Sequence, residues 1–331
     1  MRKYLLVFAV WFALLFGGFW LYVARFPVNY LDAEFAIWQA KERLIAAPCD
    51  GPCPELVVLG DSTAVAGVDP RRLPMPALNL ALGGGTAMEA YYVLDRWLES
   101  HPPPKMVLLS LAPYHFQESL FWERLTRYHF LRFREQREAL AALADFPTPP
   151  LVDEATGAVV EPSLFEALLY RAWFPSKYSN SVIEARGATR RRDNEVFYRD
   201  VLAQRGFKTF GAHARNDESN GIEKRPAEFA VAGVLDHYMD RLLALADAKD
   251  IAVRFYVMPY NEASWAIAER ERAVYVAGYH AHLAALAARS GRFRVLNALW
   301  KLPADHFGDS SHVNARGLDV VTEDLVRRLQ N

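Results

Sequence analysis

Five short apolar runs, spread over most of the chain, constrain its fold more than any other feature of the sequence. They cover residues 56–59, 78–82, 106–111, 253–258 and 293–297. Stretches with apolar residues at helical spacing separate them, and strands that alternate with helices form parallel sheets. A continuous apolar strand is also buried on both of its faces. We therefore expect an α/β fold of three layers, α/β/α, built around a five-stranded parallel sheet.

The helical spacing predicts seven helices between and beyond these strands. They cover residues 32–47, 86–100, 115–145, 161–173, 227–250, 264–289 and the C-terminal end to residue 328. The 115–226 segment lacks the apolar runs that mark the predicted sheet strands, and it is too long for a structureless loop. We predict a mostly helical insertion that serves as a lid or substrate-binding region. Its arginines, at 186 and 190–192, suit an anionic glycan or lipid headgroups, or they form a solvated charged face.

The N-terminal stretch is apolar enough to cross a membrane. Residues 4–23 contain no charged side chain, and a helix of that length spans about 30 Å, the thickness of the hydrocarbon core. Arg2 and Lys3 precede it, and basic residues favour the cytoplasmic side. We expect residues 1–25 to anchor the chain in the inner (cytoplasmic) membrane by a single span, with the rest in the periplasm. The alternative is a cleaved signal peptide, which has a shorter apolar core and ends in small residues.

Composition excludes several classes of protein. Of 331 residues, 38 are Lys or Arg and 39 are Asp or Glu, a balance that argues against binding to nucleic acid. Hydrophobic residues make up 52% of the chain, which excludes global disorder. We expect residues 26–54 to connect the anchor to a catalytic domain over residues 55–331.

Cys49 and Cys53 lie in the connector, in the sequence Cys-Asp-Gly-Pro-Cys. In an exported protein, two thiols this close, with a Gly-Pro turn between them, are typical of a structural disulfide. The closed loop is short, so we expect its entropic stabilisation to be small. Two free thiols are the alternative, and a redox-active pair would have two intervening residues rather than three.

Two short motifs carry the candidate chemistry. A Gly-Asp-Ser sequence ending at Ser62 follows the first strand, and Asp-Ser-Ser-His at 309–312 follows the fifth. A serine hydroxyl becomes a nucleophile when an imidazole takes its proton, and a carboxylate orients that imidazole. Both loops are expected at the carboxyl edge of the sheet, where ligands bind. We predict Ser62 as nucleophile, His312 as general base and Asp309 as its orienting partner. The alternative is that Ser62 caps a helix and His312 is a surface residue.

Other candidate groups fit their chemistry less well. His306 is a rival base, but it lacks the Asp-x-x-His spacing and precedes Gly308. The glycines at 83–85 lack the lysine and the spacing of a phosphate-binding loop. No set of His, Cys, Asp or Glu residues has the spacing of a metal site, so we expect neither a metal nor another cofactor.

The two motifs, each in its strand context, resemble the SGNH (GDSL-type) hydrolase superfamily over most of residues 55–114 and 250–330. The resemblance implies a flavodoxin-like SGNH fold and the catalytic roles given above. It also implies an oxyanion hole formed by the backbone N–H groups of Ser62 and Gly84.

The third sequence block departs from the family pattern. Residues 112–114 read Ala-Pro-Tyr, where the family has Gly-x-Asn. Tyr114 then either donates a hydrogen bond through its hydroxyl or lines the pocket with Asp61 and His115. This departure disfavours a generic lipase or thioesterase.

The anchor, the insertion and the altered third block together resemble the membrane-anchored periplasmic O-acetyltransferases of the alginate type and the related D-alanyl transfer proteins of teichoic-acid synthesis. Gly206-Phe207 is a weak match to a segment of that branch. The resemblance implies a serine acyltransferase that receives an acyl group from a multi-span membrane O-acyltransferase and transfers it to an exported polysaccharide. Among acyl groups, the resemblance favours acetyl. Two alternatives stay open: a periplasmic carbohydrate esterase with the same triad, and a glycan-binding module with a vestigial triad.

Overall fold

The computed structural model describes the whole chain except residues 50, 118–121, 148–149, 153–158, 186–188 and 331. Its centre is a sheet with the strand order β2-β1-β3-β6-β8, in which every neighbouring pair is parallel. The strands are β1 (Leu56–Gly60), β2 (Ala77–Asn79), β3 (Met106–Ser110), β6 (Ala252–Phe255) and β8 (Phe293–Val295). The predicted α/β class and five-stranded parallel sheet are confirmed.

Both faces of this sheet are buried. Val57 and Leu59 of β1 pack into one hydrophobic cluster, and Leu56 and Val58 pack into another, because successive side chains of a strand point to opposite faces. Helices α4 (Ala87–Ser100), α10 (Gly233–Ala248) and α12 (Ala273–Arg289) contribute to the first cluster, and α3 (Ser62–Gly67) and α13 (Ala315–Gln330) to the second. The continuous apolar runs of the sequence reflect this two-sided burial.

The single helix predicted over residues 264–289 is wrong. The structure has two helices there, α11 (Glu262–Glu271) and α12, separated at Arg272, whose φ of −130° is not helical. Arg272 donates through Nη2 to the carbonyl of Glu223. This contact holds α11 against a 3₁₀ turn, η5 (Ile222–Lys224), while α12 packs against β8. The two halves therefore have different partners, and the chain bends between them.

The insertion is mostly helical, as predicted, but more divided. The predicted 115–145 helix is a 3₁₀ turn η3 (Pro113–Phe116) followed by α5 (Trp122–Arg127) and α6 (Phe133–Asp145), with a left-handed residue, His129, at φ 58° between the last two. Next come β4 (Leu151–Val152), β5 (Val159–Val160), α7 (Leu164–Arg171), η4 (Pro175–Lys177), α8 (Ser179–Glu184) and α9 (Arg190–Ala203). The short antiparallel pair β4–β5 was not predicted.

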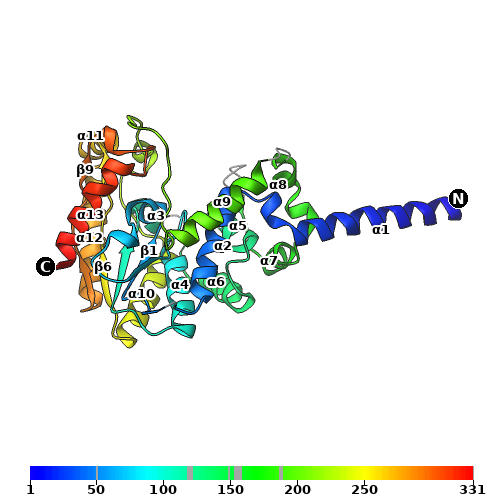
Figure 1. The fold of residues 1–331 in the computed structure, drawn as a ribbon, viewed down its shortest axis with the longest axis horizontal. Helices are drawn as coiled ribbons and strands as arrows, with labels where there is room; N and C mark the ends of the chain where they lie inside the picture. The colour runs from blue at the N-terminus through cyan, green and yellow to red at the C-terminus, as the bar shows by residue number, and fades with distance from the viewer. Residues whose placement is uncertain (50, 118–121, 148–149, 153–158, 186–188, 331) are drawn as a thin grey trace.

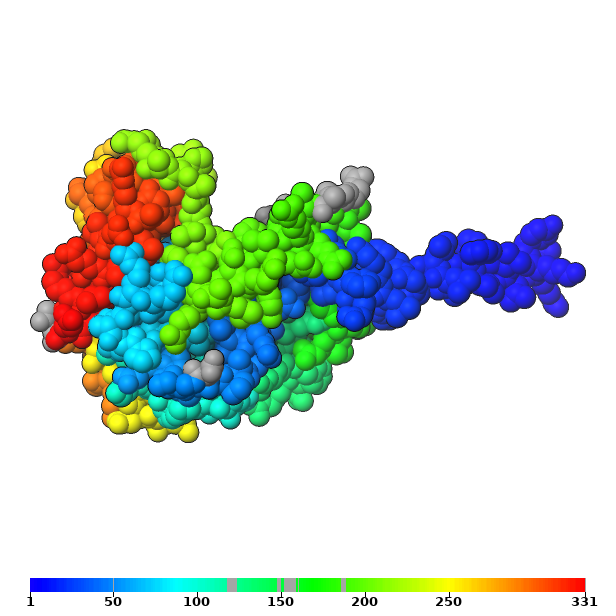
Figure 2. All heavy atoms as spheres, in the orientation of Figure 1, coloured from blue at the N-terminus to red at the C-terminus, as the bar shows by residue number. Residues whose placement is uncertain are grey.

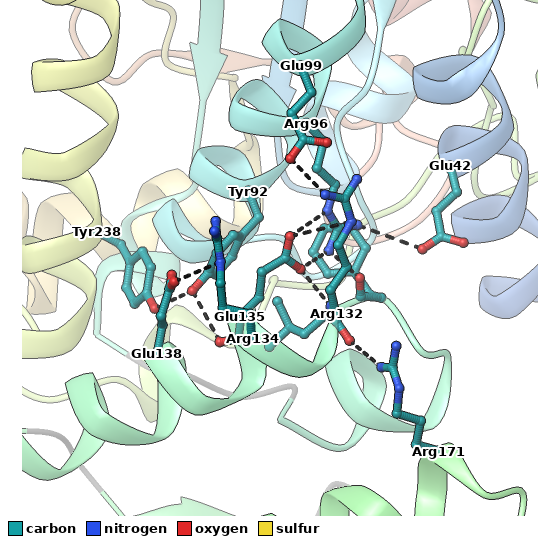
Figure 3. A network of polar contacts seen from close by, with 12 residues as sticks. Glu42, Tyr92, Arg96, Glu99, Arg132, Arg134, Glu135, Glu138, Arg171 and Tyr238 are labelled. Atoms are coloured by element: carbon teal, nitrogen blue, oxygen red, sulfur yellow. Dashed lines mark hydrogen bonds and ion pairs between the residues drawn. The ribbon is translucent and has the colours of Figure 1, made fainter.

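A buried ion pair fastens the insertion to the sheet domain (Figure 3). Arg96 on α4 donates through Nε to Glu135 on α6 at 3.1 Å, and through Nη2 to the carbonyl of Phe130. Only 6% and 5% of the two side chains are exposed. Arg132 and Glu99, nearer the surface, form a second pair across the same helices. Helix α6 is therefore linked to α4 by charge, while its packing neighbours are α7 and α10.

The connector helix α2 (Ala33–Ala46) is tied to the strand end beside the first motif. Lys41, completely buried, donates through Nζ to the backbone carbonyl of Asn79 at 2.7 Å and to the carbonyl of Gly206. Asn79 in turn donates through Nδ2 to the carbonyls of Ala64 and Val68 at the end of α3, both at 2.9 Å. Burial lowers the pKa of Lys41 well below its ordinary value.

Helix α1 (Arg2–Arg25) stands clear of the body as a rod (Figure 2). It is the single helix among the described residues that is long and apolar enough to cross a membrane. Behind it, η1 (Pro27–Asn29) leads into α2. Cys49 and Cys53 form the predicted disulfide, with their Cα atoms 5.2 Å apart.

Candidate functional site

The Gly-Asp-Ser motif forms the turn between β1 and α3. Gly60 has a φ of 142°, and a Cβ there would lie 1.8 Å from the carbonyl oxygen of Ser110, so only glycine lets β1 and β3 approach this closely. Asp61 caps α3, because its Oδ1 accepts hydrogen bonds from the backbone N–H and the hydroxyl of Thr63 at 2.8 and 2.6 Å. Ser62 is the first residue of α3 and is partly exposed. The turn thus presents a hydroxyl at the carboxyl end of β1.

Gly84 lies in a turn packed against the same strand end. The N–H of Leu82 donates to the carbonyl of Gly60 at 3.0 Å, and the N–H of Gly85 closes the turn on the carbonyl of Leu82 at 2.9 Å. Gly84 takes the left-handed conformation with φ 66°, which glycine adopts without strain. The residue assigned by resemblance to the oxyanion hole is therefore next to the Ser62 turn.

The Asp-Ser-Ser-His motif forms a compact turn before α13. The Asp309 carboxylate accepts the backbone N–H of Ser311 at 2.9 Å and that of His312 at 2.8 Å. Its Oδ2 also lies 2.8 Å from Nδ1 of the His312 ring. Burial raises the pKa of Asp309, but these hydrogen bonds lower it by more. The pKa of Asp309 is therefore below its ordinary value.

His312 has the features of a general base. Nδ1 is engaged by the carboxylate, and Nε2 is buried with no hydrogen-bond partner. An imidazole whose Nδ1–H is held by a carboxylate presents the Nε2 lone pair to a proton donor. No hydrogen bond joins Nε2 to the hydroxyl of Ser62 among the described residues. Such catalytic contacts are often long before substrate binds.

One pocket is lined by neighbours of both motifs, but Ser62, Asp309 and His312 are not among its described lining residues. It is lined by Thr63, Ala112, Pro113, Tyr114, Asn220, Val257, Met258, Pro259, Tyr260, Ser310 and Ser311. Thr63 follows Ser62 directly, and Ser310 and Ser311 lie between Asp309 and His312. The ends of β1, β3 and β6 therefore converge with the C-terminal turn, as the rule for parallel sheets predicts.

The altered third block forms part of this pocket. Tyr114 lines it, with the guanidinium of Arg225 4.4 Å from the centre of its ring. Asp61 is fully buried behind it, and its Oδ2 accepts the N–H of Ala112 at 2.6 Å. His115 is 2% exposed and its Nε2 lies 3.5 Å from the same Oδ2. Neither Asp61 nor His115 is among the described residues that line the pocket.

His115 is held neutral by its surroundings. Burial lowers its pKa to about 4, opposed in part by the Asp61 carboxylate. Both ring nitrogens lack hydrogen-bond partners. His115 therefore lies buried beside the Asp61 carboxylate and carries no charge near neutral pH.

Part of the predicted insertion packs against the histidine turn, through residues that sequence analysis did not name. The ring of Phe210 packs on that of His312 with centroids 4.9 Å apart. A Cβ on Gly211 would lie 2.3 Å from the Gly308 carbonyl, and the N–H of His213 donates to that carbonyl at 3.2 Å. Asn220 lines the pocket itself. The signal available in the sequence was Gly206-Phe207, just before this segment.

Asn261 is a second residue that sequence analysis missed. It belongs to β7 (Tyr260–Asn261), which pairs in parallel with β9 (Lys301–Leu302). Its Nδ2 donates to the carbonyl of Ser310 at 3.0 Å and to that of Glu218 at 2.6 Å. It therefore fixes the histidine turn to the insertion and to α11, which its Oδ1 caps.

The rival base, His306, also has an acidic partner. Its Nδ1 lies 2.8 Å from Oδ1 of Asp305, a pairing of adjacent residues that the spacing rule did not foresee. Asp305 is shared with Arg316 at 3.1 Å. His306 lies in the 3₁₀ turn η6 (Ala304–His306) and, like His312, is not among the described residues of the pocket wall.

No group of three or more His, Cys, Asp or Glu side chains in the described part of the chain is arranged to hold a metal ion. A search against protein-family models finds no match to this chain, and a search of curated proteins finds no significant one. The site combines a serine hydroxyl, an oriented imidazole and a glycine turn at the carboxyl edge of a parallel sheet.

Proposed function

We propose that this protein is a membrane-anchored serine O-acyltransferase that acylates, foremost acetylates, an exported polysaccharide. The observation that carries the proposal is His312, whose Nδ1 lies 2.8 Å from the Asp309 carboxylate and whose Nε2 is buried without a partner. A side chain held in this way accepts a proton at one defined atom, as the activation of a serine nucleophile requires.

The reaction proceeds in two balanced steps. Ser62 Oγ attacks the acyl carbonyl while His312 Nε2 takes its proton, and that proton then passes to the leaving group of the donor. An acceptor hydroxyl next attacks the acyl-serine, His312 takes its proton, and the proton returns to Ser62 Oγ. Backbone N–H groups of Ser62 and Gly84 would stabilise the oxyanion, and loss of one such donor costs about 3 kcal/mol in known enzymes.

The fold supports the same proposal. The strand order, with the first strand between the second and third, and the two apolar clusters on either side of the sheet fit a three-layer SGNH arrangement. Helix α1 fits a single inner-membrane span with the body in the periplasm, where the Cys49–Cys53 disulfide would persist. A multi-span membrane O-acyltransferase would then supply the acyl group.

A cellular experiment tests this function. The acyl content of the exported polysaccharide is measured in cells with the wild-type protein and with Ser62→Ala. Loss of acyl groups is the expected result. A gain would show an esterase instead, and unchanged acylation with intact glycan binding would show a binding module.

A second experiment uses the purified full chain in detergent with an aryl acetate as acyl donor. We expect Ser62→Ala to abolish release of the aryl alcohol and His306→Ala to leave it nearly unchanged. Equal losses in the two variants would contradict the assignment of His312 as base. Adding an oligosaccharide acceptor separates transfer from hydrolysis, because transfer yields an acylated sugar.

A further inference from the structure

Large apolar side chains are exposed on two helices of the insertion, α7 and α8, and are together called the apolar patch. On α7, Phe165 is 71% exposed, Leu168 is 42% exposed and Leu164 is 37% exposed; on α8, Ile183 is 54% exposed. Keeping large apolar side chains in water is unfavourable by roughly 25 cal/mol for each Å². A group of them on neighbouring elements therefore indicates a surface that is covered in the cell.

The patch lies at the base of α1. The segment between α7 and α8 packs against that helix: the Phe174 ring is 5.8 Å from the ring of Phe16 and 5.5 Å from that of Trp20. Trp20 Nε1 donates to the carbonyl of Ala172 at 2.9 Å. Figure 1 shows α7 and α8 at the end of the body from which α1 projects.

The helix geometry sets the depth of this contact. If the apolar stretch of α1 fills the hydrocarbon core, its outer boundary lies near Val23. Phe16 is seven residues earlier, which corresponds to about 10 Å along the helix axis. Phe174, which touches Phe16, then lies below the boundary, and α7 and α8 on either side of it lie at the level of the headgroups.

Several polar groups of this region are paired within the protein. Glu166 pairs with Lys177, and Arg171 donates to the carbonyl of Leu131 at 2.9 Å. The N–H of Phe174 donates to the carbonyl of Leu169 at 3.0 Å. Inside the hydrocarbon region, irregular backbone is tolerated only when its polar groups are paired within the protein.

We propose that α7 and α8 enter the interface of the bilayer that α1 crosses, so that the insertion forms a second attachment to the membrane. Lipid is the favoured occupant because the segment that joins α7 to α8 packs against the apolar surface of α1, whose Trp20 lies where aromatic residues gather in membrane proteins. This inference rests on the proposed anchor. It gives the insertion a second role, attachment to the membrane, that is separate from the predicted lid over the pocket.

The test uses spin labels on the full chain reconstituted in nanodiscs of phosphatidylcholine and phosphatidylglycerol. Single cysteines are introduced by Phe165→Cys and Ile183→Cys in the patch, Phe12→Cys in α1, and Val274→Cys on α12 as matched control. Val274 is 65% exposed, on a helix that packs against β8 at the edge of the sheet. The readout is relaxation of each label by oxygen, which concentrates in lipid, and by a water-soluble nickel complex.

We expect labels at 12, 165 and 183 to respond more to oxygen, with position 12 deepest, and the label at 274 to respond more to nickel. Nickel access at 165 and 183 equal to that at 274, with position 12 still in lipid, would overturn the second attachment and leave the anchor intact. Nickel access at 12 would overturn the anchor and this inference with it. Labels at 165 and 183 shielded from both reagents would show a protein contact and would also overturn it.

Discussion

Asp309 holds His312 in two ways at once: its carboxylate accepts the backbone N–H of His312 at 2.8 Å and lies 2.8 Å from Nδ1 of the same residue. The turn and the ring are therefore positioned by one group. The three-residue spacing of the motif follows from this geometry, because a capping carboxylate reaches the N–H two and three residues ahead.

Asp309→Asn should separate these two functions. The amide oxygen can still accept the backbone N–H groups, so the turn should persist, but the negative charge that stabilises the imidazolium is lost. We expect aryl acetate turnover to fall by about 10² to 10⁴, with little change in the thermal midpoint. Asp305→Asn is the matched control, since its carboxylate lies 2.8 Å from Nδ1 of His306. Comparable losses in both variants would contradict the assignment.

The stability of the protein should depend on pH through His115. Its folded pKa of about 4 lies below the ordinary 6.5, so its contribution is complete above about pH 6.5 and is lost as the pH falls towards 4. The shift corresponds to roughly 3 kcal/mol. His129, also lowered to about 4 by burial, adds a similar loss.

His115→Gln isolates the first contribution, because the variant keeps His129. We expect the thermal midpoint of the full chain in detergent to fall less between about pH 7 and about pH 4.5 in the variant than in the wild type. Identical pH dependence in the two proteins would show that His115 is not buried as a neutral ring.

The buried ion pair between α4 and α6 should be costly to break. Glu135→Gln removes the nearest counter-charge of the buried Arg96 and leaves it with the more distant Glu42, at 3.9 Å. Removing one partner of a buried ion pair destabilises proteins by about 3–5 kcal/mol. Glu138→Gln on the same helix is the control: its side chain is 35% exposed and pairs with Arg134 at 3.2 Å, so we expect a loss below about 1 kcal/mol. Chemical denaturation of both variants measures the difference, and equal stability would contradict the network in Figure 3.

Removal of the disulfide should have a modest effect. The disulfide closes a short loop between Cys49 and Cys53. By restricting the unfolded chain it raises the free energy of unfolding by no more than about 2 kcal/mol. The double variant Cys49→Ser with Cys53→Ser should therefore fold, keep its aryl acetate turnover and unfold at slightly lower temperature. Loss of folding would show that the loop contributes more than chain entropy.

The sequence predicted the sheet well because its strands are buried on both faces and read as uninterrupted apolar runs. The second strand shows the limit: it was expected over 78–82, but the ladder of β2 ends at Asn79. Asn79 directs its side-chain amide to the end of α3. Leu80 still donates a backbone hydrogen bond to β1, so the apolar pattern continues beyond the regular strand.

The candidate site was predictable where its chemistry is local in sequence. Asp309 and His312 interact within one turn, so their spacing revealed them. Phe210, Asn220 and Asn261 reach the same place through tertiary contacts of the insertion and of β7, and no short-range pattern marks such residues. The break at Arg272 was missed for the same reason, since its partner Glu223 is far away in the sequence.

The contacts of Lys41 connect the connector helix α2 rigidly to α3, the helix that begins with Ser62. Lys41 Nζ donates to the carbonyl of Asn79, and the side-chain amide of Asn79 donates to the carbonyls of Ala64 and Val68. Rotation of either helix relative to the other would break these hydrogen bonds. The direction from which a substrate approaches the hydroxyl of Ser62 is therefore fixed relative to α2.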